Sequence, residues 1–299
     1  MTKYIGEIAG IATSVCFAAN AVFITRAGQK VGSVISNRTR VVFALIYLII
    51  LNIIFFQQPL PFTATSDRWT WLALSGVIGL ALGDAFLFQS YLLVGPRLGM
   101  LLLSLSTVIG MFEAWIFLGE SLGLIQIIGI ALTLGGIIWV AMEQGNGNGQ
   151  APHHAALGVL FGILSAVCQA TGLVFSKQGL YGNFSPIQGN SIRMFAAALS
   201  LWLIAALQKE AGTTIQTLKA NPSALKQLAI AAFIGPVLGV SSSLLAIQHT
   251  QIGIASVLTS LAPVFMLPVS HYIFKERLGW QAIVGTLLAM AGVTILFLS

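Results

Sequence analysis

The sequence predicts an all-α membrane protein of ten transmembrane helices, built as two inverted five-helix repeats. Composition is the first observation behind this fold class: 57% of the 299 residues are hydrophobic, only 7% are charged, and the mean hydropathy is +0.93. A soluble protein could not cover its surface with so few polar groups, so lipid must be the outer solvent. Ten long apolar segments and an internal repeat are the other two observations.

Each of the ten apolar segments is long enough to cross about 30 Å of hydrocarbon, which takes roughly 20 helical residues. Turn-forming residues separate them: residues 57–68 hold two prolines and an aspartate, Gly95 and Pro96 form a turn, and residues 143–152 are rich in Gly and Asn. The first segment lacks an Ala-x-Ala cleavage site and is expected to remain as helix one. The predicted helices span residues 4–25, 36–56, 69–94, 98–118, 122–142, 155–176, 186–207, 225–248, 252–274 and 280–298.

An internal repeat divides the chain into halves. Residues 79–136 recur 156 positions later as residues 235–292, and the front of each half matches at offsets of 152 and 153. Matching pairs include Gly83/Gly239, Glu120/Glu276, Gly136/Gly292, Cys16/Cys168, Asn37/Asn190 and Arg40/Arg193. Because five helices per repeat is an odd number, the second copy must enter the membrane from the opposite side. We predict a first repeat over residues 1–144, a polar linker over 145–154 and a second repeat over 155–299.

The net charge of +6 comes from 14 Lys and Arg residues against 8 acidic residues, with no basic run along the chain. We interpret these as loop charges that flank membrane spans, so nucleic acid is not an expected partner. Cys16 and Cys168 have no CxxC motif or Cys/His cluster near them, so neither a metal site nor a disulfide is expected. No cofactor is expected.

The ends of the two repeats carry a family resemblance. Residues 103–123, LSLSTVIGMFEAWIFLGESLG, and residues 258–279, LTSLAPVFMLPVSHYIFKERLG, are each followed by a last helix of the repeat, which is Gly-rich in the first copy. Together with Arg40 and Arg193 at helix starts, they resemble the drug/metabolite transporter superfamily, specifically its ten-helix carriers with two EamA-type domains. The resemblance covers essentially the whole chain. One departure is Thr107, where the family often has the proline seen here as Pro263.

This resemblance implies a carrier of small metabolites such as amino acids, nucleosides, sugars or drugs, with both termini in the cytoplasm. We expect a secondary transporter in the inner membrane, most simply an exporter, that works by alternating access as a monomer or homodimer. The charge distribution opposes this orientation: ten Lys and Arg would lie outside and four inside, the reverse of the positive-inside rule. The alternatives are a passive channel or a membrane scaffold.

An intramembrane hydrolase is a weaker alternative. Residues 81–84 read A-L-G-D, close to the G-x-G-D of membrane aspartyl proteases, but that chemistry needs a second carboxylate that shares the proton. The other aspartate, Asp67, lies in a predicted loop. The sequence has no G-x-S-G serine element and no H-E-x-x-H zinc site either, so the chain is not expected to be an enzyme. It also has no nucleotide-binding loop, so energy from ATP would have to come from another subunit.

Two acids, Asp84 and Glu113, fall well inside predicted spans. Intramembrane acids are candidates for a substrate or coupling site, where they bind a cation or carry a proton. In the alternative, each is a structural acid hydrogen-bonded to a neighbouring helix. Further polar side chains at membrane depth either contact substrate or join helices; those we select are Asn20, Gln89, Gln169, Ser242, Thr259, Ser260 and His271.

Prolines and glycines predict local geometry. Pro263 and Pro268 each remove a backbone donor and are expected to kink the ninth helix, with a gating role as an option. Glycines four residues apart lie on one helix face and allow another backbone to approach closely. We therefore assign four such pairs to helix packing: Gly6/Gly10, Gly79/Gly83, Gly158/Gly162 and Gly235/Gly239.

Four charged residues at helix ends receive structural interpretations. Glu120 and Glu276 precede the last helix of each repeat, where a carboxylate stabilises the helix dipole, so we expect them to act as caps. Arg40 and Arg193 are expected to anchor helix starts at the lipid headgroups; lining a cavity mouth is the alternative.

Overall fold

The computed structural model describes residues 5–118, 123–146, 154–182, 184–249, 258, 260–276 and 279–298, all of them helix or connecting loop. The first half of the chain forms α1 (Ile5–Val31), α2 (Ser33–Phe56), α3 (Ser66–Ser75), the π-helix η2 (Gly76–Gly83), α4 (Asp84–Leu103), α5 (Leu105–Leu118) and α6 (Leu124–Asn146). The second half forms α7 (Ala155–Gly179), α8 (Pro186–Leu207), α9 (Ala211–Ala220), α10 (Pro222–Ala232), the π-helix η3 (Phe233–Gly239), α11 (Val240–His249), α13 (Ala262–Phe274) and α14 (Trp280–Leu298).

The all-α fold is confirmed, and each of the ten predicted crossings contains helical residues among those described, with changes at their boundaries. α3, η2 and the first part of α4 form one crossing, which ends at Gly95 (φ 81°) before Pro96. The remainder of α4 and α5 form the next crossing. Among the described residues, seven continuous helical segments are long and apolar enough to span a membrane, and one of them, Ser66–Gly110, contains two crossings. The remaining two crossings, α13 and the apolar part of α14, are shorter.

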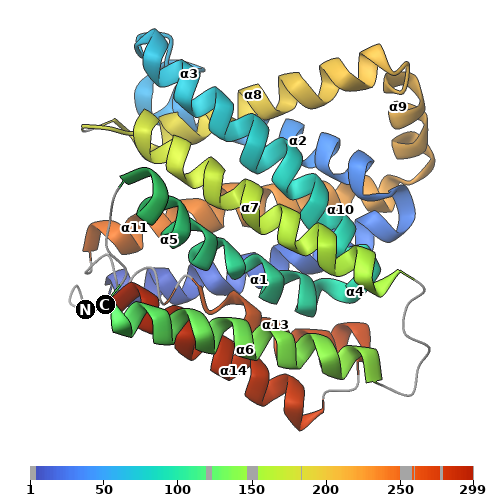
Figure 1. Ribbon diagram of the computed structural model, residues 1–299. Helices are drawn as coiled ribbons and strands as arrows, with labels where there is room; N and C mark the ends of the chain where they lie inside the picture. Colours follow the sequence, from blue (N-terminus) through green and yellow to red (C-terminus); the bar gives the residue numbers. More distant parts are fainter. Residues whose placement is uncertain are drawn as a thin grey trace.

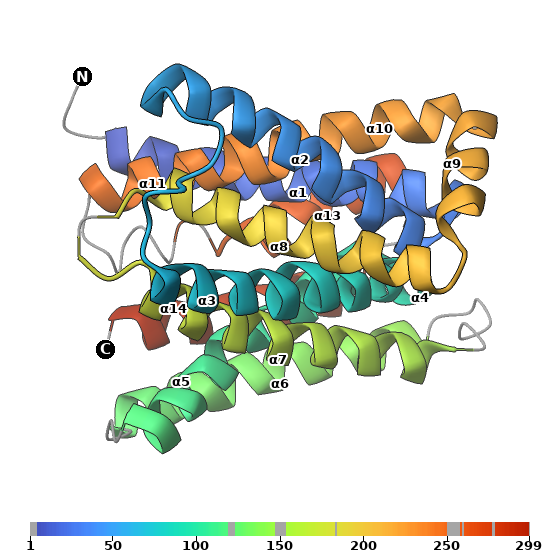
Figure 2. The same ribbon diagram turned by 90° about the horizontal axis from the view of Figure 1, so that it is seen from above.

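Several predicted boundaries were wrong. α1 continues to Val31 rather than residue 25, because its last turns pack in the core through Ala27 and Val31. α3 begins at Ser66 and α10 at Pro222, each three residues earlier than expected. The helix α9 was not predicted; it crosses the end of the bundle between α8 and α10 (Figure 2). Most of the predicted start of the ninth helix, residues 252–257 and 259, lies outside the described residues.

The two halves run in opposite directions. In Figure 1, α1 runs from left to right whereas its repeat equivalent α7 runs from right to left, and α2 and α8 are opposed in the same way. The start of α1 and the end of α14 lie at the same end of the bundle. This arrangement is what an odd number of crossings per repeat requires.

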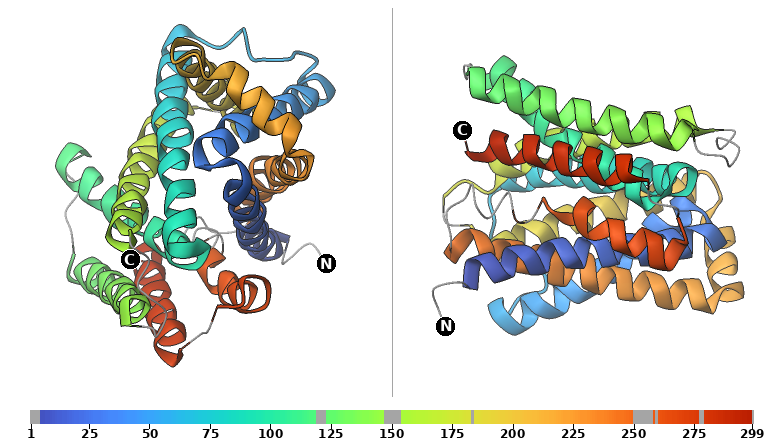
Figure 3. Two further views of the ribbon diagram at one scale, coloured as in Figure 1. Left: turned by 90° about the vertical axis from the view of Figure 1, so that its right-hand side faces the viewer. Right: turned by 90° about the horizontal axis from the view of Figure 1, so that it is seen from below.

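The halves are interleaved rather than side by side. One buried cluster joins α1 and α4 to α10 and α13, through residues such as Ala18, Leu87, Leu228 and Met266. A second cluster joins α4 and α6 to α7 and α14. Figure 3 shows α6 and α14 lying together, one from each half. Large apolar side chains such as Phe55, Leu124 and Leu207 are well exposed, as expected for a surface that faces lipid.

Close approach of α6 and α14 depends on glycine. A Cβ added at Gly136 would lie only 2.5 Å from the backbone nitrogen of Ala289 and from the carbonyl oxygen of Gly285. The neighbouring Gly135 is exposed, and a Cβ there would meet nothing within 4 Å. Gly136 therefore fixes the distance between these two helices.

Candidate functional site

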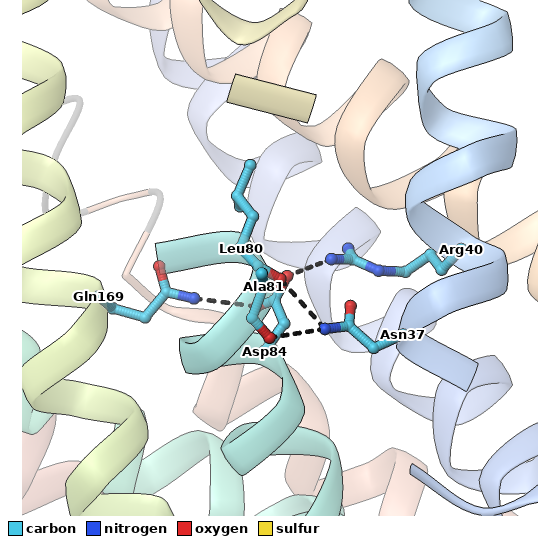
Figure 4. Close-up of polar contacts among 6 residues, drawn as sticks. All are labelled: Asn37, Arg40, Leu80, Ala81, Asp84 and Gln169. Carbon is cyan, nitrogen blue, oxygen red and sulfur yellow. Dashed lines mark hydrogen bonds and ion pairs between the residues drawn. The ribbon is translucent and has the colours of Figure 1, made fainter. Parts of the chain in front are cut away.

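Asp84 lies where the π-helix η2 meets α4, and only 5% of the residue is exposed. The sequence of η2, GVIGLALG, has three glycines, which allow other helices to pack closely against it. A π-helical turn leaves local carbonyls without the ordinary helical donor. Asn37 of α2 supplies one: its side-chain nitrogen donates to the carbonyl oxygens of Ala81 at 2.9 Å and Leu80 at 3.2 Å (Figure 4).

Asp84 has partners from both halves of the chain. Arg40 of α2 donates to one carboxylate oxygen in a buried ion pair, and Gln169 of α7 donates to the other at 2.9 Å (Figure 4). The Arg40 guanidinium also lies over the ring of Phe88, 5.0 Å from its centroid. Arg40 is only 5% exposed, so the prediction of a headgroup anchor was wrong for this residue. Arg40 is instead the charge partner of Asp84 inside the bundle.

Arg193 of α8 completes this group from the second half. It interacts electrostatically with Asp84. Its Nη2 atom lies 3.7 Å from the position that a Cβ on Gly79 would occupy, and the Gln169 side-chain oxygen is equally close to that position. We call Asn37, Arg40, Asp84, Gln169 and Arg193 the Asp84 cluster. It lies between the two repeats and has two positive charges and one negative charge.

Glu113 lies apart, on α5. One of its carboxylate oxygens accepts a hydrogen bond from the Thr171 hydroxyl of α7 at 2.8 Å. Its other oxygen is buried and has no partner among the described residues. Glu113 also joins the two halves, because Thr171 belongs to the second repeat.

The other described polar residues that the sequence analysis proposed as candidates lie apart from one another and from the Asp84 cluster. Asn20 faces η3, where its side-chain Cγ would lie 2.8 Å from a Cβ on Gly235. Gln89 accepts a hydrogen bond from Ser33 at 2.5 Å. His271 is exposed at the end of α13, with Nδ1 3.1 Å from the carbonyl oxygen of Glu276. Ser242 and Ser260 are partly buried, and Thr259 lies outside the described residues.

Pro263 and Pro268 occupy different positions in α13. Pro263 lies in the first turn, where a helix needs no donor from this residue, so it begins the helix instead of kinking its interior. Pro268 lies inside α13 and leaves the carbonyl of Val264 without its helical donor.

The selected glycines all lie where helices meet or are buried. A Cβ added at Gly10, Gly158, Gly162, Gly235 or Gly239 would approach a side chain of another segment to between 2.5 and 2.8 Å. Gly79 and Gly83 face α7, with Cβ positions 3.6 Å from Gly172 and 3.1 Å from Cys168. Gly6 is buried. These distances support the packing interpretation.

Arg97 and Glu276 form an ion pair that sequence reasoning did not anticipate. Their closest nitrogen and oxygen atoms are 3.2 Å apart, and Glu276 was expected to cap the next helix. Burial raises the pKa of Glu276, while Arg97 and Ser270 counteract that rise. Its repeat equivalent Glu120 lies outside the described residues. This pair connects α4 of the first half to the segment after α13.

A groove of about 350 Å³ lies between α1 and α13. Its lining is apolar apart from Arg26, with Val15, Ala19 and Val269 among its residues. Val15 and Ala19 lie on a different face of α1 from Asn20 and Phe17, which contact η3. None of the described residues that line the groove belongs to the Asp84 cluster, so the two are distinct.

Comparisons with known proteins agree with this arrangement. The model of the EamA-like transporter family matches residues 4–142 and 156–298, one match in each half of the chain. A solved structure titled "Crystal structure of protein" is 17% identical, covers 95% of both chains and has a TM-score of 0.52. That likeness concerns the fold alone. A comparison with curated proteins finds no match.

Proposed function

Because the chain belongs to the EamA-like transporter family, and is thus a multi-pass membrane transporter and not an enzyme, we propose that it is a secondary active exporter of small organic metabolites. Amino acids and related compounds are the proposed substrate range. The observation that carries this proposal is the Asp84 cluster, to which both repeats contribute side chains. Internally repeated transporters bind substrate near the midplane, between the repeats.

The same arrangement supports a mechanism of alternating access. Arg40 and Asp84 belong to the first repeat, whereas Gln169 and Arg193 belong to the second. A relative movement of the repeats would break or rearrange these contacts and expose the cluster to one side of the membrane and then the other. Two π-helical segments, η2 and η3, lie in equivalent places of the repeats. Such segments often mark functional positions in helices.

Asp84 and Glu113 are the proposed coupling residues, for a proton or another cation. Each is an acid inside a crossing with a hydrogen-bond partner from the other repeat. Protonation or cation binding at either acid would alter an interaction between the repeats. Coupling by such a step requires that the two conformations differ in their affinity for the ion.

A passive channel and a non-transporting scaffold are the competing functions, and their flux behaviour separates them from a carrier. The hydrolase alternative finds no support in the site. Asp67 is exposed in the first turn of α3, 17 residues before Asp84 in the same crossing, which corresponds to about 25 Å of helix. Two carboxylates must be nearly in contact to share a proton.

A thermal-shift screen of purified protein against a metabolite library would identify the substrate, because a ligand that binds only the folded protein stabilises it. The hits would then be tested for transport in reconstituted vesicles. We expect uptake that saturates with substrate concentration. Uptake proportional to concentration at all levels would indicate a channel, and complete lack of flux would indicate a scaffold.

The remaining features of the proposal are expectations for a carrier of this family. We propose location in the inner membrane, cytoplasmic termini, and a monomer or homodimer as the working unit. We retain repeat boundaries at residues 1–144 and 155–299, with residues 145–154 as the linker between them.

A further inference from the structure

The Asp84 cluster has an uneven charge balance. Arg40 and Arg193 contribute two guanidinium groups, which stay protonated in proteins, whereas Asp84 contributes the cluster's one carboxylate. Both carboxylate oxygens already have partners, Arg40 on one and Gln169 on the other. An uncompensated charge away from water costs several kcal/mol. The cluster therefore has a place for one additional negative charge.

The imbalance comes from a difference between the repeats. Arg40 and Arg193 are repeat equivalents at an offset of 153, so each half has an arginine at this position. Asp84 has its equivalent at an offset of 156, which is Val240, the first residue of α11 after η3. The first repeat thus supplies its arginine with an acid, and the second repeat does not.

Arg193 is also positioned to receive a ligand. Among the described residues its guanidinium makes no hydrogen bond or ion pair within contact distance, and its Nε atom is buried without a partner. Arg193 as a whole residue is partly exposed, whereas Arg40 is buried. Gly79 lacks a Cβ, and an atom at the Cβ position would be in ordinary van der Waals contact with the Arg193 Nη2 atom, the Gln169 side-chain oxygen and the Cα of Gly172. The Arg193 guanidinium and the Gln169 amide therefore border the same small position between η2, α7 and α8.

We propose that Arg193 binds an anionic group of the transported substrate, so that the substrates are organic carboxylates or phosphates. This inference rests on the proposed transport function and names its substrate class. The planar guanidinium can bind two oxygens of a carboxylate or phosphate at once, which adds geometric selectivity to the charge attraction. Asp84 keeps Arg40 occupied, and Arg193 remains available for the substrate.

The test compares anionic probes with uncharged counterparts. Purified protein in detergent would be heated with benzoate or benzamide, with indole-3-acetate or indole-3-acetamide, and with glycerol phosphate or glycerol, all at constant ionic strength. We expect the charged member of at least one pair to raise the melting temperature, and its uncharged partner to have no effect. The first two pairs test carboxylates and the third tests phosphates.

Variants then assign the effect to Arg193. Arg193→Gln should lose the response to the anion. Arg193→Lys keeps the charge but not the paired donors, so its apparent affinity should fall by roughly tenfold. Arg68→Gln is the matched control, because Arg68 stacks on Tyr181 and Phe184 at one end of the bundle. It should respond as the wild type does.

Three results would overturn the assignment: equal responses to charged and uncharged members, no response to any anion, or wild-type responses in both Arg193 variants. If Arg193→Gln does not fold, the Arg193→Lys variant alone tests the assignment: a weaker response to the anion supports it, and a wild-type response overturns it. The wider proposal is tested separately. Saturable transport of metabolites that have no carboxylate or phosphate group would refute the anion site while leaving the carrier function intact.

Discussion

Asp84 and Arg40 form a buried ion pair whose members depend on one another. Both are about 5% exposed, and Arg193 adds a second positive charge nearby. Removing one partner of a buried pair leaves an uncompensated charge, which typically destabilises a protein by about 3–5 kcal/mol. We therefore expect Asp84→Asn to lower the melting temperature markedly and to abolish transport.

A double-mutant cycle isolates the interaction. Adding Arg40→Gln to Asp84→Asn should restore much of the lost stability, because the unpaired charge is removed together with its partner. Asp67→Asn, at an exposed position of α3, is the matched control and should leave stability unchanged. Additive effects of the two cluster mutations would show that Asp84 and Arg40 have no interaction energy with each other in the folded protein.

Glu113 offers a separate test of coupling. It has one hydrogen bond, from Thr171, and one buried oxygen without a partner. Glu113→Gln keeps the size and the acceptor but removes the ionisable group. If Glu113 is the coupling site, the variant should fold and transport substrate without the pH or ion dependence of the wild type. Thr171→Val, which removes only the hydroxyl donor, should retain that dependence; full dependence in Glu113→Gln would make this acid structural.

At this scale the sequence predicted candidates but not their contacts. Asp84, Glu113 and Gln169 stood out as polar residues in apolar helices. The partnership of Asp84 with Arg40 depends on how α2 approaches η2, which periodicity does not specify. A signal for it was nevertheless present: Asn37/Asn190 and Arg40/Arg193 recur in both repeats. Arginines at helix starts resemble headgroup anchors, so the interpretation followed the commoner role.

Helix pairing gives a prediction at the scale of elements. Gly136→Ala should force α6 away from α14, because the new methyl group would lie 2.5 Å from backbone atoms of α14. We expect destabilisation of about 1–3 kcal/mol, as found for overpacked interiors. Gly135→Ala is the control at the adjacent position, where nothing lies within 4 Å. Thermal unfolding of both variants tests this, and equal stabilities would contradict the role of Gly136.

Helix existence was easier to predict than helix type. Long apolar runs marked the crossings, but the π-helical turns of η2 and η3 depend on backbone hydrogen bonding that hydropathy does not report. α9 was missed because its sequence, AGTTIQTLKA, is polar and short. Its position depends on tertiary contacts: Arg38 of α2 forms an ion pair with Glu210 at 2.9 Å and donates to Thr214 at 3.3 Å.

Orientation belongs to the scale of the whole molecule. Inversion of the halves places the start of α1 and the end of α14 at one end of the bundle. We propose that this end faces the cytoplasm. Three of the ten basic residues that oppose this assignment, Arg38, Arg40 and Arg97, are buried inside the protein and do not act as loop charges. Alkaline phosphatase, which is active only in the periplasm, should be inactive when fused after Ser299. Full activity of the fusion would reverse the orientation.

The inverted repeat was predictable because the same residues recur in the two halves at nearly constant offsets. An odd number of helices per repeat then requires the two copies to have opposite orientations in the membrane. The interleaving of the halves was not predictable in the same way. It depends on small residues such as Gly172, whose Cβ position lies 3.0 Å from the Cα of Gly79 in the other half. Spacing alone does not identify which glycine meets which helix.

Countertransport in reconstituted vesicles tests most directly whether the two repeats form an alternating-access carrier. Vesicles loaded with unlabelled substrate at high concentration would be diluted into a trace of labelled substrate. A carrier whose site faces one side at a time should accumulate label transiently above its external concentration, and Arg193→Gln should lose this accumulation for an anionic substrate. Equilibration of label without any overshoot in the wild type would contradict the account and indicate a passive pore.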